Sequence, residues 1–141
     1  MMFANSGRDE LRRRYVNAWQ RQRDGLPLEP LDAQIADVIS LHPEYHAFLE
    51  APEASAQSFT VEQGRTNPFL HMGLHLAIRE QVATNRPAGI HAVHKRLAQR
   101  LGDVHEAEHR MIEVLAEALW EAQRSGTAPD EQRYLERLRQ L

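Results

Sequence analysis

Apolar residues recur every three to four positions along most of the chain, which is the period of an amphipathic α-helix. The apolar stripes and boundary residues predict helices at about 7–24, 30–41, 43–49, 68–84, 88–101, 103–124 and 130–140. No stretch shows the alternation of a strand, and there is no internal repeat. The pattern therefore predicts an all-α fold, a helical bundle of about five to seven helices.

The stretch 68–84 gives the clearest helix signal. Asn67 is a favoured N-cap residue, and Pro68 is a favoured first residue of a helix. Apolar side chains then follow on almost every side, which is typical of a helix buried in a protein core. We therefore expect 68–84 to be the buried central helix, with His71 and His75 in a stripe that also carries core residues.

Boundary residues and composition predict how the remaining segments are arranged. Ser6 resembles the N-cap of the first helix, and Asp103 resembles that of the helix at 103–124. Residues 51–66 are small, polar and turn-rich, so we expect a long connection or a mobile flap there. Because a chain of this length fits one domain, we expect a single all-helical domain over residues 1–141.

A buried carboxylate is expected in the helix at 103–124. The apolar face of this helix carries Val104, Met111, Ile112, Leu115 and Leu119. On a helical projection, Glu108 lies near the middle of that face, and His105 and His109 lie on its flank. A carboxylate in this position is costly unless it is paired, hydrogen-bonded or bound to a cation.

Composition and charge narrow the function classes. An apolar fraction of 42% and a charged fraction of 26% are those of an ordinary soluble folded protein. Residues 1–25 carry six arginines against three acids, whereas residues 26–63 carry seven acids and no Lys or Arg, so we expect these segments to pair. The run from Arg12 to Arg14, in a chain of net charge −3, is too short to predict nucleic-acid binding and favours a solvated helix face.

The chain has no cysteine, which excludes thiolate metal sites, nucleophilic thiols and disulfides. Histidine and carboxylate therefore remain as metal ligands. No segment has the length of a membrane span or the apolar core of a signal peptide, so we expect a cytoplasmic protein. A chain of this size buries a core without metal, so a bound metal would serve function rather than folding.

Histidine is the most informative residue type. The eight histidines form four couples at helical spacing: His42/His46, His71/His75, His91/His94 and His105/His109. Residues three or four apart share a helix face, so each couple points two imidazoles in one direction. We expect a metal site in the core, and its candidate ligands are His71, His75, His105, Glu108 and His109. Such ligands suit Zn, Fe, Mn or Ni, and the remaining couples have no assigned role.

The histidines are also compatible with a protease site and with a purely structural role. His105, Glu106 and His109 spell HEAEH, the zincin pattern of two zinc-binding histidines and a glutamate general base. The sequence offers neither the third ligand nor the substrate-binding strand of zincins. Structural histidines would be hydrogen-bonded in a helical core, and a buried His and Glu pair is further suited to sensing pH.

Parts of the chain resemble known families. The segment HMGLHL, from His71 to Leu76, is similar to the zinc-ligand helix of a small bacterial endoribonuclease family of ribosomal RNA maturation, whose motif reads HGxLHLxGxDH. The third histidine of that motif falls at Gln81 here, and its second glycine falls at Ile78. The stretches EPLDAQIADVISLHPEYH and TNPFLHMGLHLAIREQ resemble a family of uncharacterised bacterial proteins grouped as a domain of unknown function. This second resemblance implies a bacterial origin, a small stand-alone protein and no established activity.

The sequence therefore predicts an all-α protein with a candidate metal site of His and Glu in its core, and it assigns no activity or substrate. The alternative, from another functional class, is a helical interaction or regulatory protein without metal. In that case the acidic segment 26–63 or the Arg-rich first helix would contact a partner. A homo-oligomer is compatible with both.

Overall fold

The computed structural model describes residues 2–51 and 67–141, with the side chains from Asp9 onward in the first helix. Within these residues there are seven α-helices, one 3-10 turn (η1) and no strand, which confirms the all-α fold. None of the described helices is both long and apolar enough to cross a membrane. The elements are α1 Met2–Arg23, α2 Pro30–Ser40, η1 Pro43–Tyr45, α3 His46–Glu50, α4 Pro68–Thr84, α5 Ile90–Leu101, α6 Val104–Ser125 and α7 Glu131–Arg139.

The chain divides into two compact units. The first unit is Met1–Gly73 and the second is Leu74–Leu141, so the boundary falls inside α4. The single domain over 1–141 stays a prediction, and each unit is described by itself. The long connection expected at 51–66 lies outside the described residues, except for Ala51 at the end of α3.

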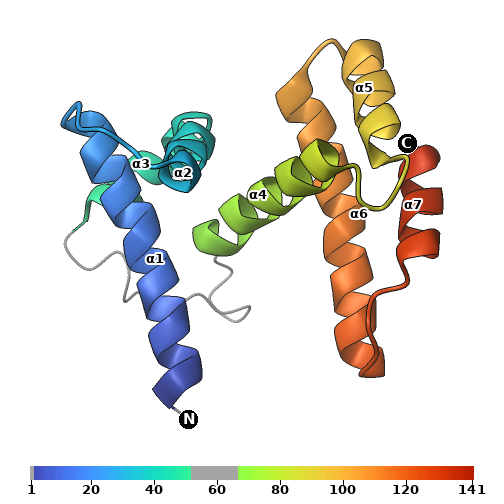
Figure 1. Cartoon of the computed structure of the whole chain (residues 1–141), viewed down its shortest axis with the longest axis horizontal. Coiled ribbons are helices and arrows are strands. Elements are labelled where there is room, and N and C mark those ends of the chain that lie inside the picture. Colours follow the sequence, from blue (N-terminus) through green and yellow to red (C-terminus); the bar gives the residue numbers. More distant parts are fainter. Residues whose placement is uncertain (1, 52–66) are drawn as a thin grey trace. The chain divides into compact units, whose positions relative to one another are not determined.

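In the first unit, α1 packs against α2 and α3 (Figure 1). Its core consists of Tyr15, Ala18, Ile35, Ala36, Val38, Ile39, Leu49, Phe69 and Met72. The helix α1 begins at Met2, so the prediction that Ser6 caps it is wrong. A serine can cap a helix only where the residues before it are not helical. Met2 to Asn5 contain no proline or glycine that would break the helix before Ser6.

The basic and acidic segments of the first unit pair as expected. Nε of Arg14 lies 2.7 Å from Oδ1 of Asp32, and Nη2 of Arg23 lies 3.2 Å from Oε1 of Glu50. These ion pairs join α1 to α2 and to α3. The arginines of the first helix are thus engaged in part with acids of the same unit.

Arg12 departs from the solvated helix face expected for the arginine run. It is only 7% exposed, and its guanidinium carbon lies 4.9 Å from the centre of the Phe69 ring. The aliphatic stem of an arginine can cover apolar surface while its head group is attracted to an aromatic face. This residue is therefore part of the packing of the first unit.

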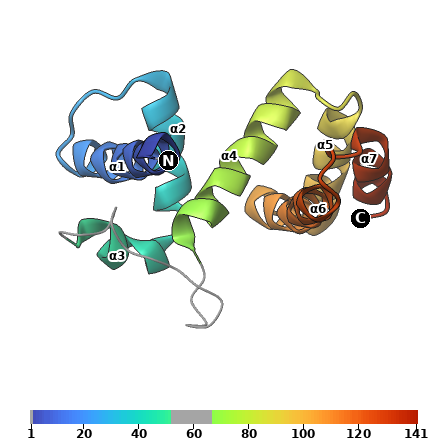
Figure 2. The ribbon, with the colours of Figure 1, turned by 90° about the horizontal axis from the view of Figure 1, so that it is seen from below.

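In the second unit, α5 and α6 form a helical hairpin, and α7 packs against both (Figures 1 and 2). Gly102 ends α5 with a φ of 70°, a left-handed conformation that favours glycine. Asp103 then caps α6, because its Oδ1 accepts the backbone N–H groups of His105 and Glu106. The buried core of this unit consists of Ile78, Ile90, Val93, Leu97, Ala107, Met111, Ile112, Leu115, Tyr134, Leu135 and Leu138.

At the ends of the apolar stripes, the side chains are more exposed than the sequence predicts. Val104 and Leu119 are 56% and 43% exposed. Leu119 lies beyond the stretch of α6 that α5 can cover, because α6 has 22 residues whereas α5 has only 12. In α4, Met72 and Ile78 are fully buried, as expected, but Leu70 is 62% exposed. The prediction that α4 is buried on every side is therefore wrong near its start, where the helix has just begun.

We expect Asp103→Ala to lower the free energy of unfolding by about 1 kcal/mol, because it removes the side-chain cap of α6. Urea denaturation followed by circular dichroism measures this change. Asp103→Asn keeps a side-chain oxygen that can accept the same N–H groups and should lose about 0.5 kcal/mol or less. Equal losses in the two variants would contradict the role of Asp103 as a cap.

Candidate metal centre

Three histidines converge in the second unit. His75 lies on α4, and His105 and His109 lie in the first two turns of α6. The latter two are four residues apart and share a face of the helix. One ring nitrogen of each histidine lies within 4.8 Å of one ring nitrogen of the other two. Three potential nitrogen ligands therefore come from two helices that pack in the same core.

The three imidazole rings are in direct contact. The ring centres of His75 and His105 are 5.2 Å apart, and the two planes are within 3° of parallel. His109 lies edge-on to both, with its centre 4.8 Å from His75 and 4.2 Å from His105. Positive charges at such separations repel each other, whereas neutral imidazoles can offer nitrogen lone pairs to a cation.

Glu108 holds the imidazole of His75 by a short hydrogen bond. Its Oε1 lies 2.6 Å from Nδ1 of His75, and the side chains are 5% and 0% exposed, respectively. Arg79 donates from Nε to both oxygens of the same carboxylate, each at 3.2 Å. Because a carboxylate accepts hydrogen bonds, Nδ1 of His75 is the donor in this contact. In a neutral ring with this arrangement, the lone pair that could bind a metal is on Nε2.

The charge of Glu108 is stable in this position. Burial alone would raise the pKa of its carboxyl group, but the hydrogen bond from His75 and the positive charge of Arg79 outweigh burial. The pKa therefore lies below its usual range. The sequence required a partner for a carboxylate on this apolar face, and the structure supplies two, both from α4.

Sequence reasoning did not identify Arg79 as part of the site. The signal was present, because Arg79 follows His75 by four residues and so lies on the same face of α4. The side chain of Arg79 is only 24% exposed. A buried carboxylate on one helix can thus indicate a cation on the helix that packs against it.

His71, the remaining candidate ligand, belongs to the first unit. Its ring lies edge-on to that of His42, with centres 5.0 Å apart, and also contacts Tyr45. Nδ1 of His42 donates to the backbone oxygen of Val38 at 2.7 Å, because a carbonyl can only accept. The structure thus places His71 in an aromatic cluster of the first unit.

The remaining histidines have separate surroundings. His46 donates from Nε2 to the backbone oxygen of Ile39 at 2.8 Å, and its ring packs on Trp19. His91 is exposed and His94 is half-buried on α5, and both line a cavity of about 240 Å³ beside Glu108. Helical spacing is therefore common to all four couples, but their environments differ.

The zincin interpretation lacks its general base in this geometry. Glu106 points to Arg110, with Oε1 3.2 Å from Nε, and the side chain of Glu106 is 47% exposed. The described residues also contain no strand on which a peptide substrate could lie. The HEAEH sequence thus contributes its two histidines to the cluster, whereas its glutamate forms a surface ion pair.

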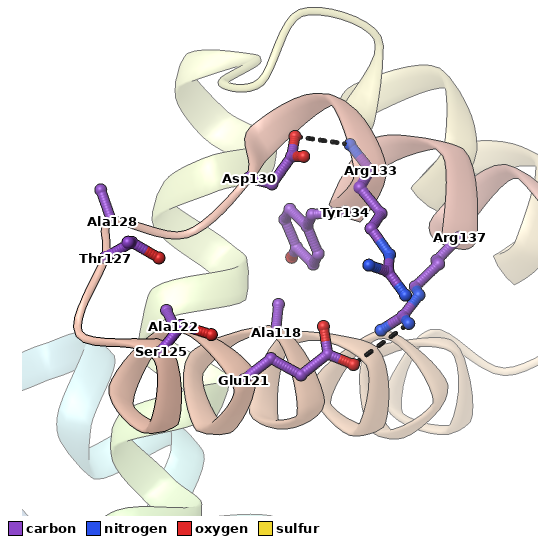
Figure 3. Close-up of a pocket in the computed structure, with 10 residues that line it drawn as sticks. All are labelled: Ala118, Glu121, Ala122, Ser125, Thr127, Ala128, Asp130, Arg133, Tyr134 and Arg137. Atoms are coloured by element: carbon purple, nitrogen blue, oxygen red, sulfur yellow. Dashed lines mark hydrogen bonds and ion pairs between the residues drawn. The ribbon is translucent and has the colours of Figure 1, made fainter.

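A second polar pocket of about 140 Å³ lies between α6 and α7, away from the histidines (Figure 3). Two of the acids that line it have partners within the pocket. Nη2 of Arg137 lies 3.2 Å from Oε1 of Glu121, and Asp130 accepts the backbone N–H of Arg133 at 3.1 Å. The first contact joins the last turn of α7 to α6 and the second caps the start of α7, so we assign both a structural role.

A family model described as a domain of unknown function (DUF1841) matches residues 7–140. The chain belongs to this family. The match confirms the resemblance to a domain-of-unknown-function family noted from the sequence. No curated protein and no solved structure matches this DUF1841 chain. Its function must therefore be inferred from the site itself.

We expect Glu108→Gln to lower the free energy of unfolding by about 1–3 kcal/mol, because charged hydrogen bonds to His75 and Arg79 are lost. Glu113→Gln, an exposed position on α6, should change it by less than about 0.5 kcal/mol. The pKa of Glu108 is lowered by folding, so its contribution is complete above pH 4.5 and is lost as the pH falls through the lowered value. Denaturation curves at several pH values test this, and a difference between wild type and Glu108→Gln that grows below pH 4.5 would contradict it.

Proposed function

We propose that the second unit of this DUF1841 protein binds a divalent transition metal through His75, His105 and His109. The observation that supports this most directly is the convergence of three ring nitrogens within 4.8 Å of one another. A metal with bonds of about 2.0–2.1 Å draws its nitrogen ligands to within about 4 Å of each other. Small rotations of the imidazoles about their side-chain bonds would bring the three nitrogens from within 4.8 Å to within about 4 Å of one another.

Glu108 acts in this proposal as an orienting group. Metal-binding histidines commonly donate their second ring N–H to a carboxylate, which fixes the tautomer and makes the ligating nitrogen more basic. The contact of 2.6 Å between Glu108 and Nδ1 of His75 has this form. Its oxygens are already hydrogen-bonded to His75 and Arg79, so we assign Glu108 to His75 instead of to the metal.

Three imidazoles suit zinc, and they also suit iron, nickel and manganese to differing degrees. A centre with three protein ligands keeps a coordination position for water or a substrate, whereas structural zinc sites are closed by four. We therefore propose a metal-binding role and assign no reaction to the centre. Zinc is the first metal to test because it accepts a set of three nitrogen ligands without a redox requirement.

The second candidate function is a metal-free helical protein with structural histidines. The contacts of Glu108 favour it, because His75 and Arg79 already compensate this carboxylate without a cation. In that case the stacked rings of His75 and His105 would serve as packing groups. The two functions predict different responses to added metal.

We expect the protein, expressed without a histidine tag and dialysed against metal-free buffer, to bind about one zinc ion per chain in calorimetric titration. His75→Ala, His105→Ala and His109→Ala should each weaken zinc binding by at least about tenfold, because each removes one of three ligands. His91→Ala, which removes an exposed histidine, should bind zinc as wild type does. Circular dichroism of each metal-free variant establishes that it is folded.

Thermal denaturation separates the two candidate functions. Zinc at about one hundred times its dissociation constant should stabilise wild type by about 2.7 kcal/mol, and the three alanine variants much less. Structural histidines instead predict that the same variants lose stability equally with zinc and with chelator. Zinc binding of equal strength in wild type and all four histidine variants would refute the proposed ligands.

A further inference from the structure

A cavity of about 570 Å³ lies in the second unit, between the end of α4 and the neighbouring parts of α6 and α7. Small-molecule sites have volumes of about 300–1,000 Å³, and this cavity falls within that range. Its apolar wall consists of Pro87, Leu115, Ala118, Leu119 and Pro129. Leu119 continues the apolar face of α6, yet it is 43% exposed. The cavity therefore offers apolar surface that a ligand could cover.

A hydrogen bond between α4 and α7 fixes the polar wall of the cavity. Tyr134 donates from its hydroxyl to Oε1 of Gln81 at 2.7 Å. Burial raises the pKa of Tyr134 above its usual range, so the hydroxyl keeps its proton and remains a donor. Glu131 lies one turn before Tyr134 on α7, and the backbone N–H of Arg86 donates to the backbone oxygen of Gln81 at 3.0 Å. The contact between Tyr134 and Gln81 thus holds Glu131 and Arg86 around one cavity.

Three charged side chains line the cavity: Glu80, Arg86 and Glu131. Within the part of the chain that the structure describes, none of the three forms a side-chain hydrogen bond or an ion pair. By contrast, Glu121 and Arg137 at the opposite side of Tyr134 pair with each other. A charged group that enters the cavity therefore meets a side chain of opposite sign without breaking an existing ion pair. Because the acids outnumber the arginine, a positive group is favoured most.

We propose that this cavity binds an α-amino acid with a large apolar side chain. The ammonium group would lie near the carboxylates of Glu80 and Glu131, and the carboxylate would lie near Arg86. The apolar side chain would cover Leu115 and Leu119. An α-amino acid carries both charges on one carbon atom, so it can satisfy the acids and the arginine together. None of the proposed metal ligands lines this cavity, so the proposal does not depend on the metal centre.

The test begins with titration of the metal-free full chain with phenylalanine, followed by two-dimensional NMR. We expect saturable shifts in the signals of residues that line the cavity, including Gln81, Leu119 and Tyr134. Phenethylamine lacks the carboxylate and phenylpropionate lacks the ammonium group, and each should bind at least about threefold more weakly than phenylalanine, the effect of one exposed charge pair. Phenylpropionate should be the weaker of the two, because the acids outnumber the arginine. Shifts that do not saturate or that lie outside the cavity, or an analogue that binds as tightly as phenylalanine, would overturn the proposal.

Variants that remove one charge then assign the groups. Arg86→Gln should weaken phenylalanine binding by at least about threefold and should not weaken that of phenethylamine, which has no carboxylate. Glu80→Gln combined with Glu131→Gln should weaken phenethylamine binding by at least about threefold and should not weaken that of phenylpropionate. Lys95→Gln and Glu136→Gln remove the same charges at exposed residues outside the cavity and should bind phenylalanine as wild type does. Equal weakening of all three ligands by Arg86→Gln, or by the double variant, would overturn the assigned contacts. The comparison of the three ligands on wild type does not depend on any variant.

Discussion

The arrangement of the second unit depends on the burial of one carboxylate. Glu108 lies within an apolar face of α6, where a negative charge is stable only if donors are held in fixed positions around it. Both donors, His75 and Arg79, come from successive turns of α4, so those turns must face Glu108. The same register brings His75 against His105 and His109, which lie on the same stretch of α6 as Glu108. The requirement to compensate one charge therefore also assembles the histidine cluster.

The elements of the fold were predictable because their boundaries carry local signals. Asn67 accepts the N–H groups of Phe69 and Leu70, and Asp103 accepts those at the start of α6, as the sequence indicated. Local signals fail where a helix lacks a clear stop, as at Ser6, or where a stripe extends beyond the neighbouring helix, as at Leu119. The failure at Leu119 depends on the length of the packing partner, which periodicity does not contain.

The candidate site was predictable only in part, for a related reason. Periodicity placed Glu108 on a buried face and required a partner for it, and the structure has both features. Spacing alone treats His71 and His75 as equivalent, since they share a face of α4, yet they contact different groups: His42 and Tyr45 in one case, Glu108 in the other. Tertiary packing decides which of two histidines one turn apart contacts a carboxylate. A one-dimensional pattern identifies the candidates and cannot choose among them.

The negative charge of Glu108 is compensated by hydrogen bonds from His75 and Arg79, and this affects the role that a metal could have at the proposed centre. A carboxylate that relied on a cation would lose its only partner when the metal left, and the core would be destabilised by an isolated buried charge. Here the hydrogen bonds from His75 and Arg79 hold the carboxylate without metal, and they engage Nδ1 of His75 and leave Nε2 for the proposed ligand role. A metal bound at the proposed centre would therefore be able to leave while the surrounding helices stay packed. This behaviour suits a metal used for function, since a structural metal contributes its binding energy to folding itself.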